Sequence, residues 1–387
     1  MNPPLDLGVF GARGIPSTYS GYETFLTTLL PELVRRGHRV TMYSRPGEVD
    51  GEGPYEGVDR IVLPAVPGKS LNTLSHGLVA SVRARAARHE VLLVVNVANA
   101  PFCALNTLTG QRVLLNTDGQ EWLRGKWGRT AKAWFRLGAR AAKHTATGLV
   151  ADCAAMARVY EDEFASPSTV IPYCFPVASF EPDRSVPGQF GLEPGGYDIV
   201  AGRLNPENGT DGVAAARASS SSRLPLLVLG RANYDSPVQR RLDDLARHDE
   251  RIRLVGHVAD RATFLSLLAL AATYVHAHSV GGMNPSLVEA MGAGALVAAL
   301  DTPFNRETLG TSGTYFARGF GDLAAVLDGL QARPVGEREA WRAAARDRVG
   351  ERFGVADVVE AYEVALRRCL PPSPRHRVHG ATRWSEG

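Results

Sequence analysis

Residues that could do chemistry gather in four short segments, each of which directly follows a predicted strand. The richest is residues 276–294, where a strand leads through two glycines into a short helix. Backbone N–H groups at the start of that helix could face an anion, and we assign Gly281, Gly282 and Met283 to this role. Glu289, on the helix, stands among apolar neighbours, which is unusual for a solvated glutamate. The segment therefore predicts a site for a negatively charged ligand.

Two histidines of the same segment, His276 and His278, alternate along the predicted strand and so point to the same face. Such a pair could suggest a metal ion, but the sequence places no third ligand nearby. The chain also has no Asp-x-Asp pair that could hold Mg²⁺ or Mn²⁺ against a diphosphate. We therefore predict no metal at this site.

The loop of residues 11–21 is rich in glycine and serine, follows a predicted strand and opens a helix. Backbone amides at such a helix start can bind a phosphate or the polar edge of a ligand. The loop matches neither the G-x-G-x-x-G fingerprint nor a P-loop, so nicotinamide and P-loop chemistry are not supported. An ordinary strand-to-helix turn is an equally good interpretation of its glycines.

Two carboxylates and one cation follow other strands. Asp118 and Glu121 stand beside Gly119, where a carboxylate could accept a proton or hold sugar hydroxyls. Asp118 could equally cap the segment that follows it. Arg203 comes after the first strand of the second half, where a guanidinium can contact a diphosphate through charge-assisted hydrogen bonds. A lone arginine at a strand end is, however, more often a surface residue.

These segments can meet only if strands and helices alternate along the chain. The apolar pattern predicts this alternation. Predicted strands of the first half cover residues 5–10, 40–43, 60–63, 91–95, 113–115 and 147–150. Those of the second half cover residues 197–200, 226–229, 252–255, 273–276 and 295–299. Stretches of helical spacing separate them, such as residues 22–36 before Gly37. The pattern predicts an α/β protein of two doubly wound, Rossmann-like domains.

A change in proline content sets the predicted domain boundaries. We assign an N-terminal domain to residues 1–175, a linker to 176–196 and a C-terminal domain to 197–353. An amphipathic helix at 354–370 could cross back to the first domain, and residues 371–387 are expected to be a mobile tail. Because ligands of such sheets bind beyond the carboxyl ends of the strands, the domains are expected to face a central cleft.

Composition excludes several classes of protein. The 387 residues include 44% hydrophobic and 21% charged side chains, as in an ordinary globular protein. A net charge of +3 is too small to predict nucleic-acid binding. The four cysteines are widely spaced, so neither a disulfide framework nor a zinc ribbon is expected. The first residues lack the features of a signal peptide and no apolar run is long enough to span a bilayer, so we expect a cytoplasmic protein.

The motif Gly-Gly-x-Asn-Pro-Ser-Leu-x-Glu-Ala-Met-Gly-Ala-Gly, at residues 281–294, resembles the C-terminal signature of glycosyltransferase family 4. Three other segments, residues 10–25, 118–127 and 301–307, look like the rhamnosyltransferase-type branch of that family. The similarity covers residues 5–353, and its motifs occur in the family's order. This resemblance implies a GT-B fold and a retaining glycosyltransferase that uses a nucleotide-diphosphate sugar, with no metal or other cofactor.

The resemblance also implies roles for single residues. Glu289 is expected to hold the ribose of the donor and Arg203 its diphosphate, and Asp118 takes the place of a histidine near the reacting sugar. The implied catalytic residues are Asp118 and Glu121. The implied donor-binding residues are Gly14, Gly21, Arg203, Asn208, His278, Gly281, Gly282, Met283, Asn284 and Glu289. Many relatives carry a second glutamate at the position of Gly281 and a lysine at that of Asn208.

The expected function is transfer of a hexose or deoxyhexose, such as rhamnose, to a glycan, lipid-linked or secondary-metabolite acceptor. Biosynthesis of cell-surface polysaccharide is the expected setting. Two alternatives stay open. One is a GT-B nucleotide-sugar epimerase, and the other is a catalytically silent nucleotide-sugar-binding protein, as the replaced glutamate and lysine would allow.

Residues 122–144 contain seven lysines or arginines and no acidic residue. Five of them recur at steps of three and four, which places them on one stripe of a helix: Arg129, Lys132, Arg136, Arg140 and Lys143. Trp127 and Trp134 would share another face. The pattern predicts peripheral contact with anionic lipid at the inner face of the membrane. A solvated helix with its tryptophans in the core, or a grip on an anionic acceptor, would explain it too.

Overall fold

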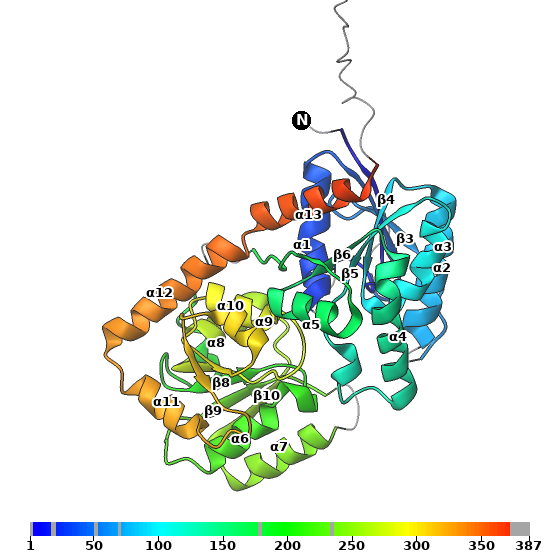
Figure 1. The fold of residues 1–387 in the computed structure, drawn as a ribbon. Helices are drawn as coiled ribbons and strands as arrows, with labels where there is room; N and C mark the ends of the chain where they lie inside the picture. Colours follow the sequence, from blue (N-terminus) through cyan, green and yellow to red (C-terminus); the bar gives the residue numbers. More distant parts are fainter. Residues whose placement is uncertain are drawn as a thin grey trace, which may run out of the picture.

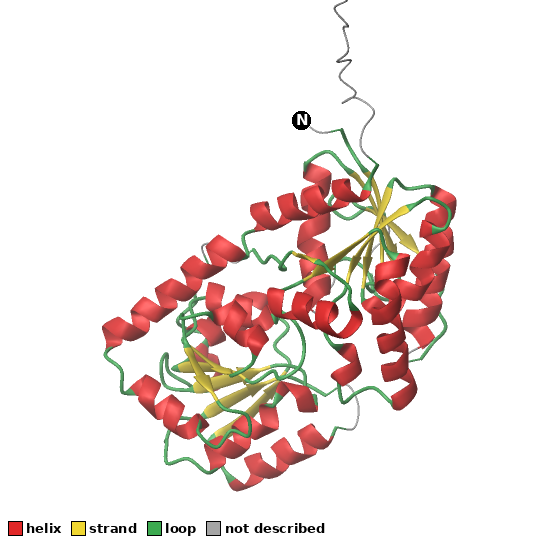
Figure 2. Cartoon of the chain, in the orientation of Figure 1, coloured by secondary structure: helices red, strands yellow, loops and turns green. Residues whose placement is uncertain are grey.

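The computed structural model describes residues 3–16, 21–49, 53–68, 71–176, 180–232 and 236–371. Over these residues the chain forms two α/β domains, each with a parallel sheet between layers of helices (Figures 1 and 2). The predicted pair of doubly wound domains is confirmed.

The sheet of the N-terminal domain has the strand order β3-β2-β1-β4-β5-β6-β7. Its strands are β1 (Asp6–Phe10), β2 (Arg39–Ser44), β3 (Asp59–Val62), β4 (Val91–Val95), β5 (Arg112–Asn116), β6 (Gly148–Ala151) and β7 (Thr169–Val170). Its helices are α1 (Gly21–Arg35), α2 (Leu71–Ala87), η1 (Val97–Asn99), α3 (Ala100–Thr107), η2 (Glu121–Leu123), α4 (Arg129–Thr145) and α5 (Ala154–Phe164). The central strand β4 is buried along its whole length, because helices cover both faces of a parallel sheet.

The sheet of the C-terminal domain has the order β10-β9-β8-β11-β12-β13. Its strands are β8 (Asp198–Ala201), β9 (Leu226–Leu229), β10 (Ile252–Gly256), β11 (Thr273–His276), β12 (Val297–Leu300) and β13 (Thr314–Phe316). The helices that follow the linker are η3 (Pro187–Phe190), η4 (Pro206–Asn208), α6 (Thr210–Ala218), α7 (Pro237–His248), α8 (Arg261–Ala269), α9 (Pro285–Gly292), α10 (Pro303–Leu309), α11 (Leu323–Gln331), α12 (Val335–Arg352) and α13 (Val355–Cys369).

Two edge strands, β7 and β13, were not predicted from the sequence. They are two and three residues long, and neither is fully buried, so their side chains give no apolar run or alternation to detect. The strand predicted at residues 295–299 begins instead at Val297, because Ala295 N–H still bonds to the Ala290 carbonyl at the end of α9.

The chain passes between the domains twice, at residues 171–197 and at the joint between α12 and α13. Helix α12 runs along the C-terminal domain, whereas α13 lies beside α1 of the N-terminal domain (Figure 1). The Tyr362 hydroxyl on α13 accepts a hydrogen bond from Asn116 Nδ2 at 2.7 Å, and its ring lies 5.3 Å from that of Phe25. The C-terminal helix is therefore part of the N-terminal domain's packing.

Candidate functional site

The loops that follow β5 and β11 come from different domains and touch each other. A Cβ atom added to Gly119 would lie 3.2 Å from the Gly281 Cα atom and 3.3 Å from the Gly282 nitrogen. Side chains would hold these backbones apart, and the glycines let them meet. The structure thus brings the second and fourth sequence segments together at the facing edges of the two sheets.

Asp118 belongs to the part of this site that the N-terminal domain contributes. Its backbone is left-handed, with φ of 56°, and its N–H donates to Asn116 Oδ1 at 2.9 Å. The side chain is half-buried. Burial raises the pKa of Asp118, and the nearby charge of Glu121 raises this pKa further. Asp118 is therefore a carboxyl group suited to accept a proton or a sugar hydroxyl.

Glu121 is surrounded by donors from the residues that follow it. Its carboxylate accepts from Trp127 Nε1 at 2.7 Å and pairs with Lys126 Nζ at 3.2 Å and with Arg124 Nε. Burial by itself would raise the pKa of Glu121, but the charges of Arg124 and Lys126 outweigh it and hold this pKa below its usual value. Glu121 is thus an ionised anchor that fixes two cations, rather than a free proton acceptor.

Arg124, Lys126 and Arg203 bring positive charge to the site from both domains. Arg124 Nη1 lies 3.8 Å from Glu207 Oε1 in η4, and Nη2 would lie 3.7 Å from a Cβ on Gly281. Burial, with the charges of Arg124 and Arg203, lowers the pKa of Lys126. In the described part of the chain, the Arg203 guanidinium has no hydrogen-bond or ion-pair partner. Glu121 and Glu207 offset part of this charge, and the guanidinium of Arg203 remains as the positive group that favours an anionic ligand.

His278 lies on the C-terminal side. Burial, with the charges of Arg124 and Arg203, lowers the pKa of His278 to about 4, so the ring is neutral at pH 7. Its Nδ1 bonds to Asn284 Oδ1 at 3.1 Å, which leaves Nε2 as the acceptor, buried and without a protein partner among the described residues. His278 can therefore receive a ligand hydroxyl but cannot neutralise a phosphate.

Asn208 and Asn284 serve the loops that carry the site. Asn208 Nδ2 donates to the Arg203 carbonyl at 2.7 Å, and Asn284 links His278 to Asn305 on α10. Both side chains hold neighbouring residues in place, and their predicted contact with the donor stays a prediction.

The amide at Met283 has a partner from the other domain. Asp152, directly after β6, accepts the Met283 N–H through Oδ2 at 2.9 Å. A Cβ on Gly282 would overlap both oxygens of Asp152. The predicted anion-binding backbone of Gly281, Gly282 and Met283 is thus in contact with a carboxyl group of this chain.

Glu289 and the glycines of the first loop have none of the contacts described above. Glu289 is buried on α9, and its Oε1 pairs with Arg261 Nη1 of α8 at 2.8 Å. A Cβ on Gly14 would meet Val49 and Ser44, so this glycine lets the loop pack on the β2 side. Gly21 is the first residue of α1, and its surroundings lie outside the described residues, as does the tail 372–387.

Sequence reasoning missed four residues as parts of this site: Arg124, Lys126, Asp152 and Glu207. The first two stand in the quoted 118–127 motif, but only the fold shows that they face the other domain. Asp152 follows a predicted strand, just as Asp118 does, and this position was the available signal. Glu207 gives no signal, because a glutamate after a proline is typical of any exposed turn.

The two tryptophans of the basic segment point inward, which corrects the predicted membrane-facing role for them. Trp134 Nε1 donates to the Ala98 carbonyl at 3.0 Å, and Trp127 Nε1 to Glu121. Both rings pack against the core. Of the basic stripe on α4, Arg129, Arg136, Arg140 and Lys143 are exposed and Lys132 is half-buried, and Lys143 Nζ donates to the Phe164 carbonyl at 2.9 Å. None of the described helices is long and apolar enough to cross a bilayer.

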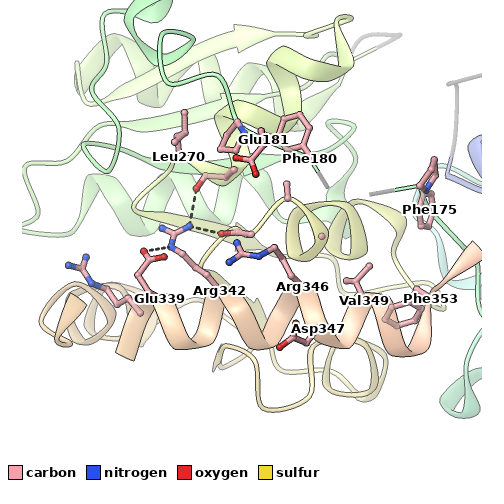
Figure 3. A pocket seen from close by; sticks show the side chains of 18 of the residues that line it. Phe175, Phe180, Glu181, Leu270, Glu339, Arg342, Arg346, Asp347, Val349 and Phe353 are labelled. Atoms are coloured by element: carbon pink, nitrogen blue, oxygen red, sulfur yellow. Dashed lines mark hydrogen bonds and ion pairs between the residues drawn. The ribbon is translucent and has the colours of Figure 1, made fainter. Parts of the chain in front are cut away.

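A large cavity lies away from this site, beside the two segments that connect the domains. It has a volume of approximately 1380 Å³ and is lined by the linker, the ends of α8 and α9, and α12 (Figure 3). There Arg342 donates to the carbonyls of Ala269 at 2.9 Å and Gly294 at 2.8 Å, which fastens α12 to the C-terminal domain. None of the predicted site residues lines this cavity.

No protein-family model and no curated protein matches the sequence. Solved structures match over nearly the whole chain. Sucrose-phosphate synthase from Thermosynechococcus elongatus is 18% identical with a TM-score of 0.77, and the match covers 94% of this chain and 98% of that one. HepE from Anabaena, in complex with UDP-glucose, is 14% identical with a TM-score of 0.74, covering 94% and 99%. An α,α-trehalose-phosphate synthase (UDP-forming) from Burkholderia vietnamiensis is 11% identical with a TM-score of 0.71, covering 94% and 99%.

These structures are GT-B glycosyltransferases, and the likeness extends over both domains and their connection. The chain therefore has the GT-B fold, as expected from the resemblance of its motifs.

Proposed function

We propose that this protein is a glycosyltransferase that transfers a hexose or deoxyhexose from a nucleotide-diphosphate sugar. The observation that carries the proposal is that Arg203 from one domain lies near enough to Arg124 and Lys126 from the other for its charge to lower the pKa of Lys126, at the ligand edges of both sheets. A diphosphate is the anion whose charge such a group of cations matches. The GT-B fold and the UDP-glucose held by HepE support a nucleotide sugar as the donor.

The geometry suggests a division of roles. Arg203, Arg124 and Lys126 would stabilise the charge that builds on the leaving diphosphate, with Glu121 holding the last two in position. Neutral His278 and half-buried Asp118 would accept hydroxyls of the transferred sugar or of the acceptor. Glu289 would accept the ribose hydroxyls, as its counterpart in the family signature implies.

The finer features of the reaction rest on the family motifs and on the charges at the site. We propose that transfer retains the anomeric configuration and that the acceptor is a glycan, a lipid-linked sugar or a secondary metabolite. We also propose that the reaction needs no metal, because Arg203 can pair with the diphosphate next to Arg124 and Lys126. Full activity in EDTA supports metal independence, and loss that Mn²⁺ restores would overturn it. The anomeric coupling in the NMR spectrum of the product tests retention.

The decisive experiment combines ligand binding with turnover. Thermal shifts with UDP, GDP and dTDP identify the base, since a ligand that binds only the folded protein raises its melting temperature. The matching sugar nucleotides are then incubated with and without glycan acceptors, and nucleotide release is measured. Release that depends on an acceptor supports transfer. An epimerised donor without acceptor would indicate an epimerase, and binding without any turnover a silent binding protein.

We also propose that the outer face of α3 and α4 contacts anionic lipid, which would bring the site to a lipid-linked acceptor. Besides its exposed arginines, α4 carries Leu137, which is 50% exposed, and Leu108 at the end of α3 is 85% exposed. Helices α3 and α4 pack together, so both kinds of side chain can share one face (Figure 1). Leucines thus take the apolar role that the sequence had suggested for tryptophans.

Vesicle sedimentation at low salt tests this contact. Changing Arg129, Arg136 and Arg140 to serine should weaken binding to anionic vesicles by about 1 kcal/mol for each residue. The matched control changes Arg240, Arg241 and Arg247 of α7 in the other domain, which should leave binding unchanged. Wild-type protein that stays in the supernatant, or equal loss in both triple variants, would contradict the proposal.

A further inference from the structure

Asp152 joins the two domains at a point where their backbones almost touch. It is fully buried between β6 and α5, and its Oδ2 accepts the Met283 N–H at 2.9 Å. The carboxyl group rests on the Gly282 backbone, where a Cβ atom would collide with it. No hydrogen-bond partner is found for the buried Oδ1 among the residues that the structure describes.

A second bond between the domains holds the same corner of the chain. Glu307 of α10 accepts the N–H groups of Ala154 at 2.6 Å and Ala155 at 2.8 Å. A carboxylate at these positions satisfies amides that a helix start leaves unpaired, and it also complements the helix dipole. The corner from β6 to α5 is therefore fastened to the C-terminal domain on both sides of Cys153.

We infer that Asp152 is a positioning residue that holds the two domains closed through its bond to the Met283 amide and its contact with Gly282. The charged or titratable groups around it are Asp118 after β5, Cys153 and Tyr160 of α5, Glu307 of α10 and Tyr362 of α13. Burial raises the pKa of Asp152 to about 8, and the charges of Asp118 and Glu307 contribute to this rise.

The protonation state of Asp152 then sets how firmly the domains close. The protonated group is neutral and can stay buried against Gly282, with no cation needed beside it. Once ionised, it faces two other carboxylates in a dry space, and it regains solvation only if the domains separate. Closure should therefore weaken as the pH rises through about 8. Because closure is measured without donor or acceptor, the inference does not rest on the proposed reaction.

The distance between two spin labels, one in each domain, tests this inference. The native cysteines in the described part of the chain are all buried, so labels can be directed to Leu108→Cys and Val335→Cys on exposed positions. Pulsed electron paramagnetic resonance gives the distance distribution between the labels at pH 6.5 and pH 9. Asp152→Asn keeps an acceptor oxygen and cannot ionise, whereas Asp152→Ala removes the bond. Asp162→Asn, at an exposed position of α5, is the matched control.

In the wild type and in Asp162→Asn, we expect a short distance at pH 6.5 and a longer or broader distribution at pH 9. Asp152→Asn should keep the short distance at both pH values, and Asp152→Ala should show the long one at both. Gly282→Ala places a Cβ atom where the Asp152 carboxyl group lies, so it should also lengthen the distance between the labels. A wild-type distance that does not change with pH, or a short distance in Asp152→Ala, would overturn the inference.

Discussion

At the residue scale, the site depends on charged groups whose partners decide what each can do. Glu121 has three donors around its carboxylate, so it orders Arg124 and Lys126 and is not available as a base. Asp118, a few residues earlier, has no such donors on its side chain in the described structure and keeps a raised pKa. Two carboxylates that look equivalent in the sequence thus have different chemistry, because only Glu121 pairs directly with the cations, whereas burial dominates at Asp118.

Glu289 should contribute to nucleotide binding. We expect Glu289→Ala to weaken binding of the nucleotide found by thermal shift by about 1.5–3 kcal/mol, or roughly tenfold to 150-fold, the range for hydrogen bonds to a charged group. Isothermal titration calorimetry measures the change. Arg261→Ala is the matched control, because it removes the ion-pair partner and leaves the carboxylate in place. Equal affinity in wild type and folded Glu289→Ala would show that the ribose is held elsewhere.

Arg203 should matter more for a diphosphate than for the nucleoside part. Arg203→Gln is expected to weaken binding of the nucleoside diphosphate by about 1.5–3 kcal/mol and to leave nucleoside binding nearly unchanged, since only the phosphates pair with a guanidinium. Arg241→Gln carries the same change of charge on exposed α7 and should alter neither. If Arg203→Gln weakened binding of the nucleoside as much as binding of the nucleoside diphosphate, the result would argue against a contact with phosphate.

At the scale of elements, the last helix shows how packing assigns a segment to a domain. Helix α13 follows the C-terminal domain in the chain, yet its buried face meets α1 and the end of β5. The buried hydroxyl of Tyr362 accepts from Asn116, the residue that also positions the Asp118 amide. The helix therefore supports the loop that carries the candidate site, although it is remote from that loop in sequence.

Tyr362→Phe should destabilise the N-terminal domain. The change leaves the buried Asn116 amide without its acceptor, which costs about 1–3 kcal/mol. Hydrogen exchange should speed up in α13 and β5 and stay unchanged in β11. The control, Tyr274→Phe, removes the hydroxyl bonded to His276 in the other domain, so its effect should fall on β11. Faster exchange spread evenly over both domains after Tyr362→Phe would contradict this view of α13.

At the scale of the whole molecule, closure brings carboxyl groups of the two domains into a common dry interface. Asp152, Glu307 and Glu207 all lie between the domains, and the first two bond to backbone amides of the opposite domain. One of the apolar clusters includes buried residues of both domains, among them Met283 and Leu287. Apolar packing therefore favours closure, and the buried carboxyl groups make it depend on pH.

The free energy of unfolding should depend on the protonation of buried Asp152. The pKa of Asp152 is about 8 in the folded chain and about 3.9 in the unfolded one. Between these values the folded protein holds one more proton than the unfolded protein, so the free energy of unfolding falls as pH rises and levels off above 8. Asp152→Asn removes this dependence. The melting temperature of Asp152→Asn minus that of the wild type should therefore be larger at pH 8 than at pH 5. Calorimetry measures both temperatures, and a difference that is the same at both pH values would contradict the assignment.

The sequence by itself determined the architecture and the segments that form the site. Apolar runs such as Val91–Val95 are long enough to read as buried strands, and their alternation with helical spacing leads to two doubly wound domains. The ends of these strands located Asp118, Arg203 and the 281–294 motif, because ligand edges follow from strand direction alone. Edge strands as short as β7 lay below what such patterns reveal.

Only the tertiary structure decided which of these residues face each other and in what state. That Arg124 approaches Glu207 of the other domain, that Asp152 bonds to Met283, and that the tryptophans of the basic segment turn inward are all contacts between distant parts of the chain. Local patterns carry no information on how two domains approach each other. The charge state of a carboxyl group is fixed by its burial and its neighbours, and both arise only when the domains meet.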